Sequence, residues 1–225
     1  LVFMKKLCLL LLIFFFPIFV FAYTKVIPGG ETIGIEVKSD GILVVGFYSI
    51  DGIDIGKKAG FVLGDRIVNV GTNSVTDLQS MMDSLQVCDS ICKIKVIRNN
   101  KEKDIDLPLS YEDGRIKTGL FVKDSIHGLG TLSFITEDRK FGCLGHEIIE
   151  NNTLERFPVA DGEIYKGEVV NIIKSRDGSA GEKNAIYDRD EVEGTISIND
   201  KTGVYTCITG GYDKLIEPKI ISSGL

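Results

Sequence analysis

The segment FGCLGHEI holds His146, one of only two histidines in this chain of 225 residues. Imidazole has an ordinary pKa close to neutral pH, so His146 is the first candidate for proton transfer. The sequence leaves four interpretations open. His146 could bind zinc as the first residue of the run HEIIE, or it could activate Cys143 as a thiolate nucleophile. It could also act as the general base for a serine, or be a polar turn residue without a chemical role.

The local pattern weighs against the first two interpretations. A zinc-protease motif needs a second histidine one helical turn later, but Glu150 stands there and no helical periodicity surrounds it. Cys143 and His146 are three residues apart, and on a strand such residues point to opposite faces. We therefore expect Cys143 to be packed. A general base needs a nucleophile within hydrogen-bond reach and a group that orients the imidazole.

The composition indicates a β-rich globular protein. Hydrophobic residues make up 44% and charged residues 26%, and the 25 glycines punctuate short apolar runs. The formal net charge of −6, without a basic patch, argues against a nucleic-acid partner.

The N-terminal residues 1–22 read as a signal peptide or membrane anchor. Lys5 and Lys6 precede an apolar run from Leu7 to Ala22, which would span about 24 Å as a helix. That is short of a hydrocarbon core of about 30 Å, so both cleavage and anchoring stay open. Either way we expect the rest to be exported, with the membrane contacted through this segment.

Residues 28–107 read as one unit of strands around a single helix. Thr76 and Gln79 suggest a capping box, followed by an apolar helical face that includes Leu78 and Met82. Asn99-Asn100 predicts a hairpin between the last two strands. PGGETIGIEV and GILVVGFYSI are read as two separate strands.

This unit resembles a PDZ domain. AGFVLGDRIVNVGTNSV is similar to the family's glycine-aspartate stretch, and Thr32-Ile33-Gly34-Ile35 is similar to its carboxylate-binding loop. The resemblance implies recognition of peptide C-termini, with an unpaired strand edge starting at Ile35 and an apolar ligand side chain between Ile33, Ile35 and the helix face of Leu78 and Met82. The alternative is a small β-barrel that serves only as a spacer.

Residues 108–225 read as an all-β segment, part of a barrel or sandwich. Short strands recur between glycine and Asp-Gly turns, and no useful helical period is present. The cysteines at 88, 92, 143 and 207 lack the spacing of a compact disulfide scaffold, so they are read as buried or loosely paired thiols.

The stretch GLGTLSFITEDRKFGCLGHEI closely resembles the SpoIVB-type serine endopeptidases, the stage IV sporulation protein B family. VIPGGETIGIEV, DGEIYKGEVVNIIKSRDGSAGEK and GTISINDKTGVY extend the likeness. The resemblance implies a signal-anchor segment, a PDZ domain and a trypsin-like barrel, with His146 as the catalytic base and no metal or organic cofactor. Cys143 stands where the family has alanine.

The resemblance also implies what the protein acts on and where. Members cleave a membrane-associated regulator in the space between mother cell and forespore. A peptide or protein substrate is thus expected, together with peptide termini bound by the PDZ domain. His127 matches no motif position and is read as a surface polar residue.

The family's nucleophilic serine lies in a G-M-S-G-S-P stretch, and the chain stops at Leu225 before any such stretch. Ser179 in DGSAG lacks the strand-turn-helix context of a nucleophile elbow and is read as part of a surface turn. We therefore expect a mainly β protein with a PDZ domain and an incomplete, truncated barrel with exposed strand edges, inactive by itself. The alternative function is an exported PDZ module that only binds peptides.

Overall fold

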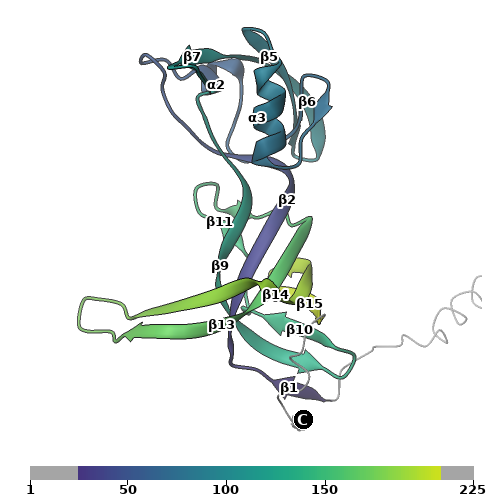
Figure 1. Ribbon diagram of the computed structural model, residues 1–225, viewed down its shortest axis with the longest axis vertical. Helices are drawn as coiled ribbons and strands as arrows, with labels where there is room; N and C mark the ends of the chain where they lie inside the picture. The colour runs from purple at the N-terminus through teal and green to yellow at the C-terminus, as the bar shows by residue number, and fades with distance from the viewer. Residues whose placement is uncertain (1–24, 209–225) are drawn as a thin grey trace, which may run out of the picture.

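The computed structural model describes residues 25–208 and forms two lobes joined by two long strands (Figure 1). These strands are β2 (Thr32–Phe47) and β9 (Leu120–Thr136), which pair antiparallel along most of their length. The expected signal or anchor segment lies outside the described residues. Within residues 25–208, no helix is long and apolar enough to cross a bilayer.

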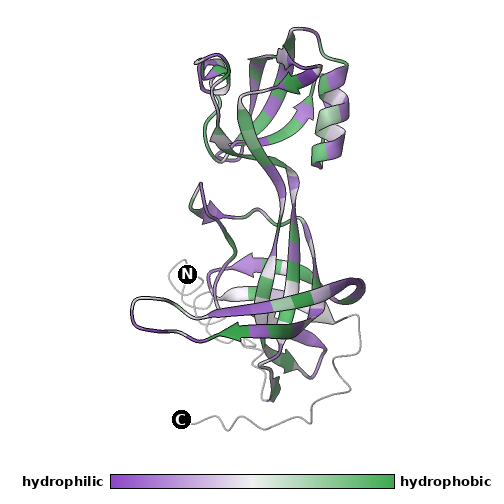
Figure 2. Ribbon diagram, turned by 60° about the vertical axis from the view of Figure 1, so that its left-hand side comes forward, coloured by the Kyte–Doolittle hydropathy of each residue, from purple (hydrophilic) through white to green (hydrophobic). Residues whose placement is uncertain are grey.

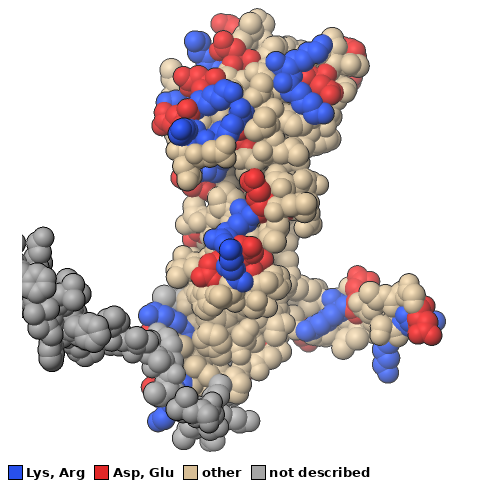
Figure 3. Space-filling model, turned by 180° about the vertical axis from the view of Figure 1, so that it is seen from behind, with Lys and Arg blue, Asp and Glu red and all other residues tan. Residues whose placement is uncertain are grey.

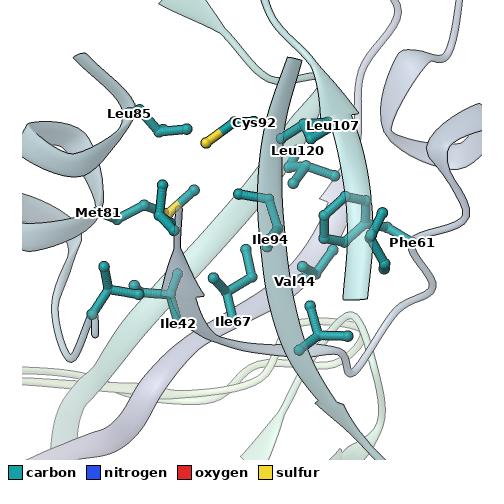
Figure 4. Packing of buried hydrophobic residues seen from close by; sticks show 14 residues of the cluster. Ile42, Val44, Phe61, Ile67, Met81, Leu85, Cys92, Ile94, Leu107 and Leu120 are labelled. Atoms are coloured by element: carbon teal, nitrogen blue, oxygen red, sulfur yellow. The ribbon is translucent and has the colours of Figure 1, made fainter. Parts of the chain in front are cut away.

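The upper lobe packs one main helix against an antiparallel sheet. Ile42, Val44, Ile67 and Ile94 of the sheet meet Met81 of the helix in a buried core (Figure 4). Besides the upper ends of β2 and β9, its elements are α2 (Ile55–Ala59), β3 (Arg66–Val70), β4 (Asn73–Ser74), α3 (Leu78–Gln86), β5 (Ile91–Arg98), β6 (Lys101–Pro108), β7 (Ser110–Glu112) and β8 (Arg115–Lys117).

Two local predictions in this lobe have different outcomes. Asn99 and Asn100 have φ values of 50° and 60° between the paired strands β5 and β6, so the predicted hairpin is confirmed. The predicted capping box is wrong by one residue. Asp77 is the N-cap of α3, and it exchanges hydrogen bonds with Ser80, because its carboxylate is a better acceptor for the backbone N–H at this position.

The lower lobe is a closed antiparallel barrel. Pairing runs from β2 to β9, β10 (Lys140–Cys143), β15 (Gly203–Ile208), β14 (Glu182–Asp200) and β13 (Asp161–Ile173), and from β13 back to β2. β1 (Val26–Pro28) adds to β9, and β11 (Ile149–Glu150) pairs with β12 (Glu155–Arg156) outside the ring. The mainly β class is confirmed, whereas the expectation that the barrel itself stays open is wrong, because β2 closes the ring.

β2 is one strand and not the two that the sequence suggested. Its pairing with β9 is irregular between Lys38 and Leu43, where Gly41 has a φ of 108° and a Cβ would lie 2.5 Å from the carbonyl oxygen of Ile67. Only glycine tolerates both conditions, so the strand continues through this narrow crossing. Its first half belongs to the lower core, and its second half is shared, with Ile42 and Val44 in the upper core and Leu43 and Val45 in the lower core. The two cores thus divide the chain differently from the predicted limits of 28–107 and 108–225.

The outer parts of β13 and β14 form a two-stranded arm that projects from the barrel (Figures 1 and 3). The arm mixes charged and apolar residues (Figures 2 and 3). Its exposed aliphatic residues are Val169, Val170, Ile172, Ile173 and Ile186. At the base, the rings of Tyr165 and Tyr187 stack with centroids 5.4 Å apart. The base is therefore packed onto the barrel while most of the arm is solvated.

Candidate active site

His146 lies on a tight turn immediately after β10. Leu144 and Gly145 have φ values of 70° and 77°, and the Gly145 N–H donates to the Cys143 carbonyl at 3.0 Å. A leucine at positive φ is uncommon and costs free energy. It is held there by packing against the lower core and by its N–H, which donates to the Thr131 carbonyl at 3.1 Å. The turn thus directs the chain away from β9 and leaves His146 exposed.

The hydrogen bond of His146 defines its tautomer. Nδ1 lies 2.9 Å from the Glu147 carbonyl oxygen. A carbonyl oxygen can only accept, so Nδ1 carries the proton, and in the neutral ring Nε2 keeps its lone pair. A base that acts through Nε2 needs this tautomer.

Two cavities meet at the imidazole. The larger, of about 340 Å³, is mostly apolar, and the smaller, of about 280 Å³, is more polar. His146, Leu129 and Leu144 line both. The larger cavity is also lined by Ile35, Ile126, Gly128, Glu147, Ile148, Ile149 and Asn151, and the smaller by Thr32, Gly130, Thr131 and Lys183.

Polar contacts hold the loop that follows His146. Glu147 forms an ion pair with Arg156 of β12. The side chain of Asn199 receives the Ile148 N–H at 2.8 Å and donates to the carbonyls of Ile148 and Phe157. These contacts bind the loop to β14 and β12 and so fix one wall of the larger cavity.

Glu150 is a fully buried carboxylate beneath the same loop. It accepts the N–H groups of Asn152 and Thr153, both at 2.8 Å, and the Lys123 ammonium at 3.0 Å. Burial by itself would raise its pKa, but the hydrogen bonds from Thr153, Lys123 and Asn152 outweigh burial and lower the pKa below its ordinary value. Glu150 is therefore a charged anchor between β9 and the loop.

The cysteines fall into two environments. Cys143 is buried, its Sγ lies 3.4 Å from the Val204 carbonyl, and burial raises its pKa to about 12. A neutral, enclosed thiol is a poor nucleophile, so the packed interpretation is confirmed. Cys88 and Cys92 form a disulfide at the end of α3. The side chain of Cys207 is not among those that the structure describes.

The structure does not bring the predicted peptide-binding residues together. Thr32 to Ile35 are buried and pair with β9 on one side and with β13 on the other. The expected unpaired edge at Ile35 is wrong, since barrel closure uses both sides of this strand. Leu78 and Met82 lie on α3 in the upper lobe (Figure 1), 37% and 56% exposed.

The free edge lies on β9 instead, which the sequence analysis missed. Within residues 25–208, β9 from Phe121 to Gly130 pairs with β2 alone. Asp124 in this stretch accepts the N–H of Leu78 at 2.9 Å and so connects the edge to the start of α3. The glycine-flanked leucine of GLGTL was the available signal, because Gly128, Leu129 and Gly130 line the cavities.

The two minor candidates have the surroundings that the sequence predicted for them. Ser179 lies in the turn at the end of the arm, where it exchanges backbone hydrogen bonds with Arg176, as expected for a surface turn. His127 is exposed on β9 opposite Glu36, so its interpretation as a surface polar residue is confirmed.

Residues 114–223 match the family model of the SpoIVB peptidase S55. The resemblance to the SpoIVB peptidases is confirmed over this segment. The match runs from the β7–β8 turn past β15, and it includes His146, the arm and the cavity-lining residues other than Thr32 and Ile35. The part of the barrel contributed by β2 lies outside the SpoIVB match.

The solved structures include one similar chain, the PDZ domain of the SdrC-like protein from Listeria monocytogenes. It is 20% identical and has a TM-score of 0.32, and the alignment covers 38% of this chain and 90% of that one. No curated protein matches the sequence.

Proposed function

We propose that this chain supplies the general base and part of the substrate cleft of a SpoIVB-type serine endopeptidase. The observation that carries the proposal is the placement of His146. Its imidazole is exposed where two cavities meet, with Nδ1 bonded to a carbonyl and Nε2 without a hydrogen-bond partner among residues 25–208, inside the segment that matches the peptidase family. An imidazole held in this way can take a proton from a hydroxyl that approaches Nε2.

The chemistry would follow serine-protease logic. Nε2 of His146 removes the proton of the serine hydroxyl as the oxygen attacks the peptide carbonyl, and an acyl-enzyme forms. The same nitrogen then returns the proton to the leaving amine. Among residues 25–208, the hydrogen-bond partner of His146 is a backbone carbonyl and not a serine or carboxylate. We therefore expect the 225-residue chain alone not to hydrolyse peptides.

The substrate would be an extended segment of a protein. An unpaired strand edge accepts an extended peptide through its backbone groups, and the free edge of β9 passes the cavities at Gly128 to Gly130. The upper lobe offers a second groove of about 650 Å³ between α3 and the β7–β8 hairpin, lined by Met82 and Tyr111 among others. This groove is our revised candidate for binding peptide termini.

The biological setting follows from the family resemblance. We propose cleavage of a membrane-associated regulator in sporulation signalling, by a protein that is exported or anchored through residues 1–22, in the space between mother cell and forespore. The apolar run from Leu7 to Ala22 supports the export part of this proposal.

The test is peptide hydrolysis by the natural gene product, purified from the cells that make it. His146→Ala should reduce kcat/KM at least about 100-fold, as expected for loss of a general base. His127→Ala is the matched control, since it removes the other histidine of these 225 residues, which lines neither cavity, and it should reduce activity far less. Equal activity of wild type and His146→Ala would refute the assignment. Hydrolysis by the pure 225-residue chain that His146→Ala abolishes would refute our expectation that it is inactive alone.

A second candidate is an exported module that binds peptides without cleaving them. It is favoured by the hydrogen bond from Nδ1 to a backbone carbonyl. In a serine peptidase a carboxylate normally accepts this hydrogen bond, orients the imidazole and stabilises the imidazolium that forms. Binding of peptides by the natural product without any hydrolysis would support this candidate.

A further inference from the structure

The two cavities at His146 differ in chemistry although they share a wall. The larger, here the aliphatic cavity, is lined by Ile35, Ile126 and Ile148 in addition to the shared leucines. The smaller, here the lysine cavity, is lined by Thr32, Thr131 and Lys183 in addition to the shared leucines. A single peptide at His146 would therefore meet an apolar and a cationic environment side by side.

Lys183 reaches this place from the arm. It lies on β14 opposite Ile172 of β13, far along the chain from His146. Among residues 25–208, no carboxylate pairs with Lys183, whereas Lys38, Lys95 and Lys123 each have such a partner. An ammonium without a counter-charge at the rim of a cavity favours an anionic ligand group.

The spacing suits two neighbouring residues of one extended peptide. Successive side chains of a strand point to opposite sides, and successive residues are about 3.3 Å apart. The cavities meet at Leu129, Leu144 and His146, so one side chain can enter each cavity while the peptide bond between them lies next to the imidazole.

We propose that the cleft selects an aliphatic residue next to an acidic residue, with the acidic side chain held by Lys183. The proposal rests on the function proposed above and names the substrate class of that site. Lys183 is then a specificity-determining residue contributed by the arm. The net charge of −6 would repel an acidic peptide at long range, so the preference has to arise locally at Lys183.

The experiment measures peptide binding to the full 225-residue chain by NMR of the two imidazole rings. The His146 signals are assigned by their loss in His146→Ala, and the His127 signals show whether the peptide also extends along the edge of β9. The probes are end-blocked hexapeptides, acetyl-Ala-Ala-Leu-Glu-Ala-Ala-amide and its Leu-Gln counterpart. The Glu-Leu and Gln-Leu orders are included because either chain direction fits the cleft.

In one of the two orders, the glutamate peptide should bind about five-fold more tightly than the glutamine peptide, which is typical of one partly exposed ion pair. Raising the salt concentration should reduce this ratio. Lys183→Met should bring the ratio to one, and Lys183→Glu should invert it. Lys174→Met is the matched control, because Lys174 lies at the outer end of the same arm and does not line the cavity; it should leave the ratio unchanged.

The outcomes separate the two proposals. If glutamate and glutamine peptides shift His146 equally and Lys183→Met has no effect, a peptide site exists but Lys183 does not select. Equal losses in Lys183→Met and Lys174→Met would show a general charge effect, and would also overturn the assignment of Lys183. If no peptide perturbs His146, the proposed substrate cleft fails, and the selection by Lys183 fails with it.

Discussion

The two lobes each bury one carboxylate against one cation, but they use it differently. In the upper lobe, the guanidinium of Arg98 donates two hydrogen bonds of 2.6 Å to the buried Asp65 and a third, of 2.8 Å, to the Gly60 carbonyl. In the lower lobe, Glu150 binds two backbone N–H groups and Lys123. The bidentate pair holds a sheet-to-loop junction in the upper lobe, while Glu150 supports the loop beside His146.

This difference indicates a division of roles. The upper lobe encloses a helix-on-sheet core (Figure 4), and its non-glycine residues at positive φ are Asp51, Asn99, Asn100 and Asp113. The lower lobe carries a leucine at positive φ, an exposed histidine and a solvated arm on a closed barrel. Asp and Asn adopt positive φ more readily than Leu or Arg, so the costly positions are Leu144, beside His146, together with Arg139 and Leu154.

The sharpest test of the comparison is Asp65→Ala. It leaves the largely enclosed Arg98 guanidinium without its counter-charge, so the free energy of unfolding should fall by about 3–5 kcal/mol. Urea unfolding followed by circular dichroism measures this loss. Asp40→Ala is the control, since Asp40 pairs with Arg66 at 3.2 Å but is 74% exposed, and it should change stability by less than about 1 kcal/mol. Equal effects of the two substitutions would contradict the structural role of Asp65.

Glu150→Gln should have the next largest effect, a loss of about 1–3 kcal/mol, because charged hydrogen bonds become neutral at a buried site. The pKa of Glu150 in the folded state is lowered from 4.5. Its contribution is therefore complete above about pH 4.5 and is lost as the pH falls through the lower folded value. Urea unfolding of both proteins at pH 7 and pH 3 should show the difference shrinking at pH 3. A constant difference would rule out the charged anchor.

Gly34→Ala should destabilise the base of the arm. A Cβ at Gly34 would lie 2.3 Å from Cγ of Tyr187, whose ring stacks on Tyr165, so the ring must move at a cost of about 1–3 kcal/mol. Gly128→Ala is the matched control, because nothing lies within 4 Å of its Cβ position. Thermal unfolding should separate the two, and a neutral Gly34→Ala would show that the stacked tyrosines move freely.

Asp77→Ala should have the smallest effect of the series. It removes the acceptor for the Ser80 N–H at 2.8 Å, and a lost N-cap shifts Tm by about 2–4 °C in a protein of this size. Thr76→Ala should shift Tm less, because Thr76 is not the N-cap. A larger shift for Thr76→Ala would restore the capping box expected from the sequence.

The features that depend on neighbouring residues could be predicted from the amino-acid sequence alone. Asn99 and Asn100 adopt positive φ readily, so their hairpin could be predicted. The alternating and glycine-punctuated runs indicated a mainly β protein, and the motif around His146 led to the peptidase family. The apolar positions of α3 followed from helical periodicity, although its N-cap was misplaced by one residue.

The pairing of the strands could be seen only in the tertiary structure. Ile33 pairs with Gly130 on one side and with Lys166 on the other, and no local pattern encodes partners about a hundred residues away. Those pairings closed the barrel, removed the expected edge at Ile35 and left β9 free from Phe121 to Gly130. They also brought Lys183 to the cavity of His146. The pairing of β14 with β13 positions Lys183 there, although it is distant from His146 in the sequence.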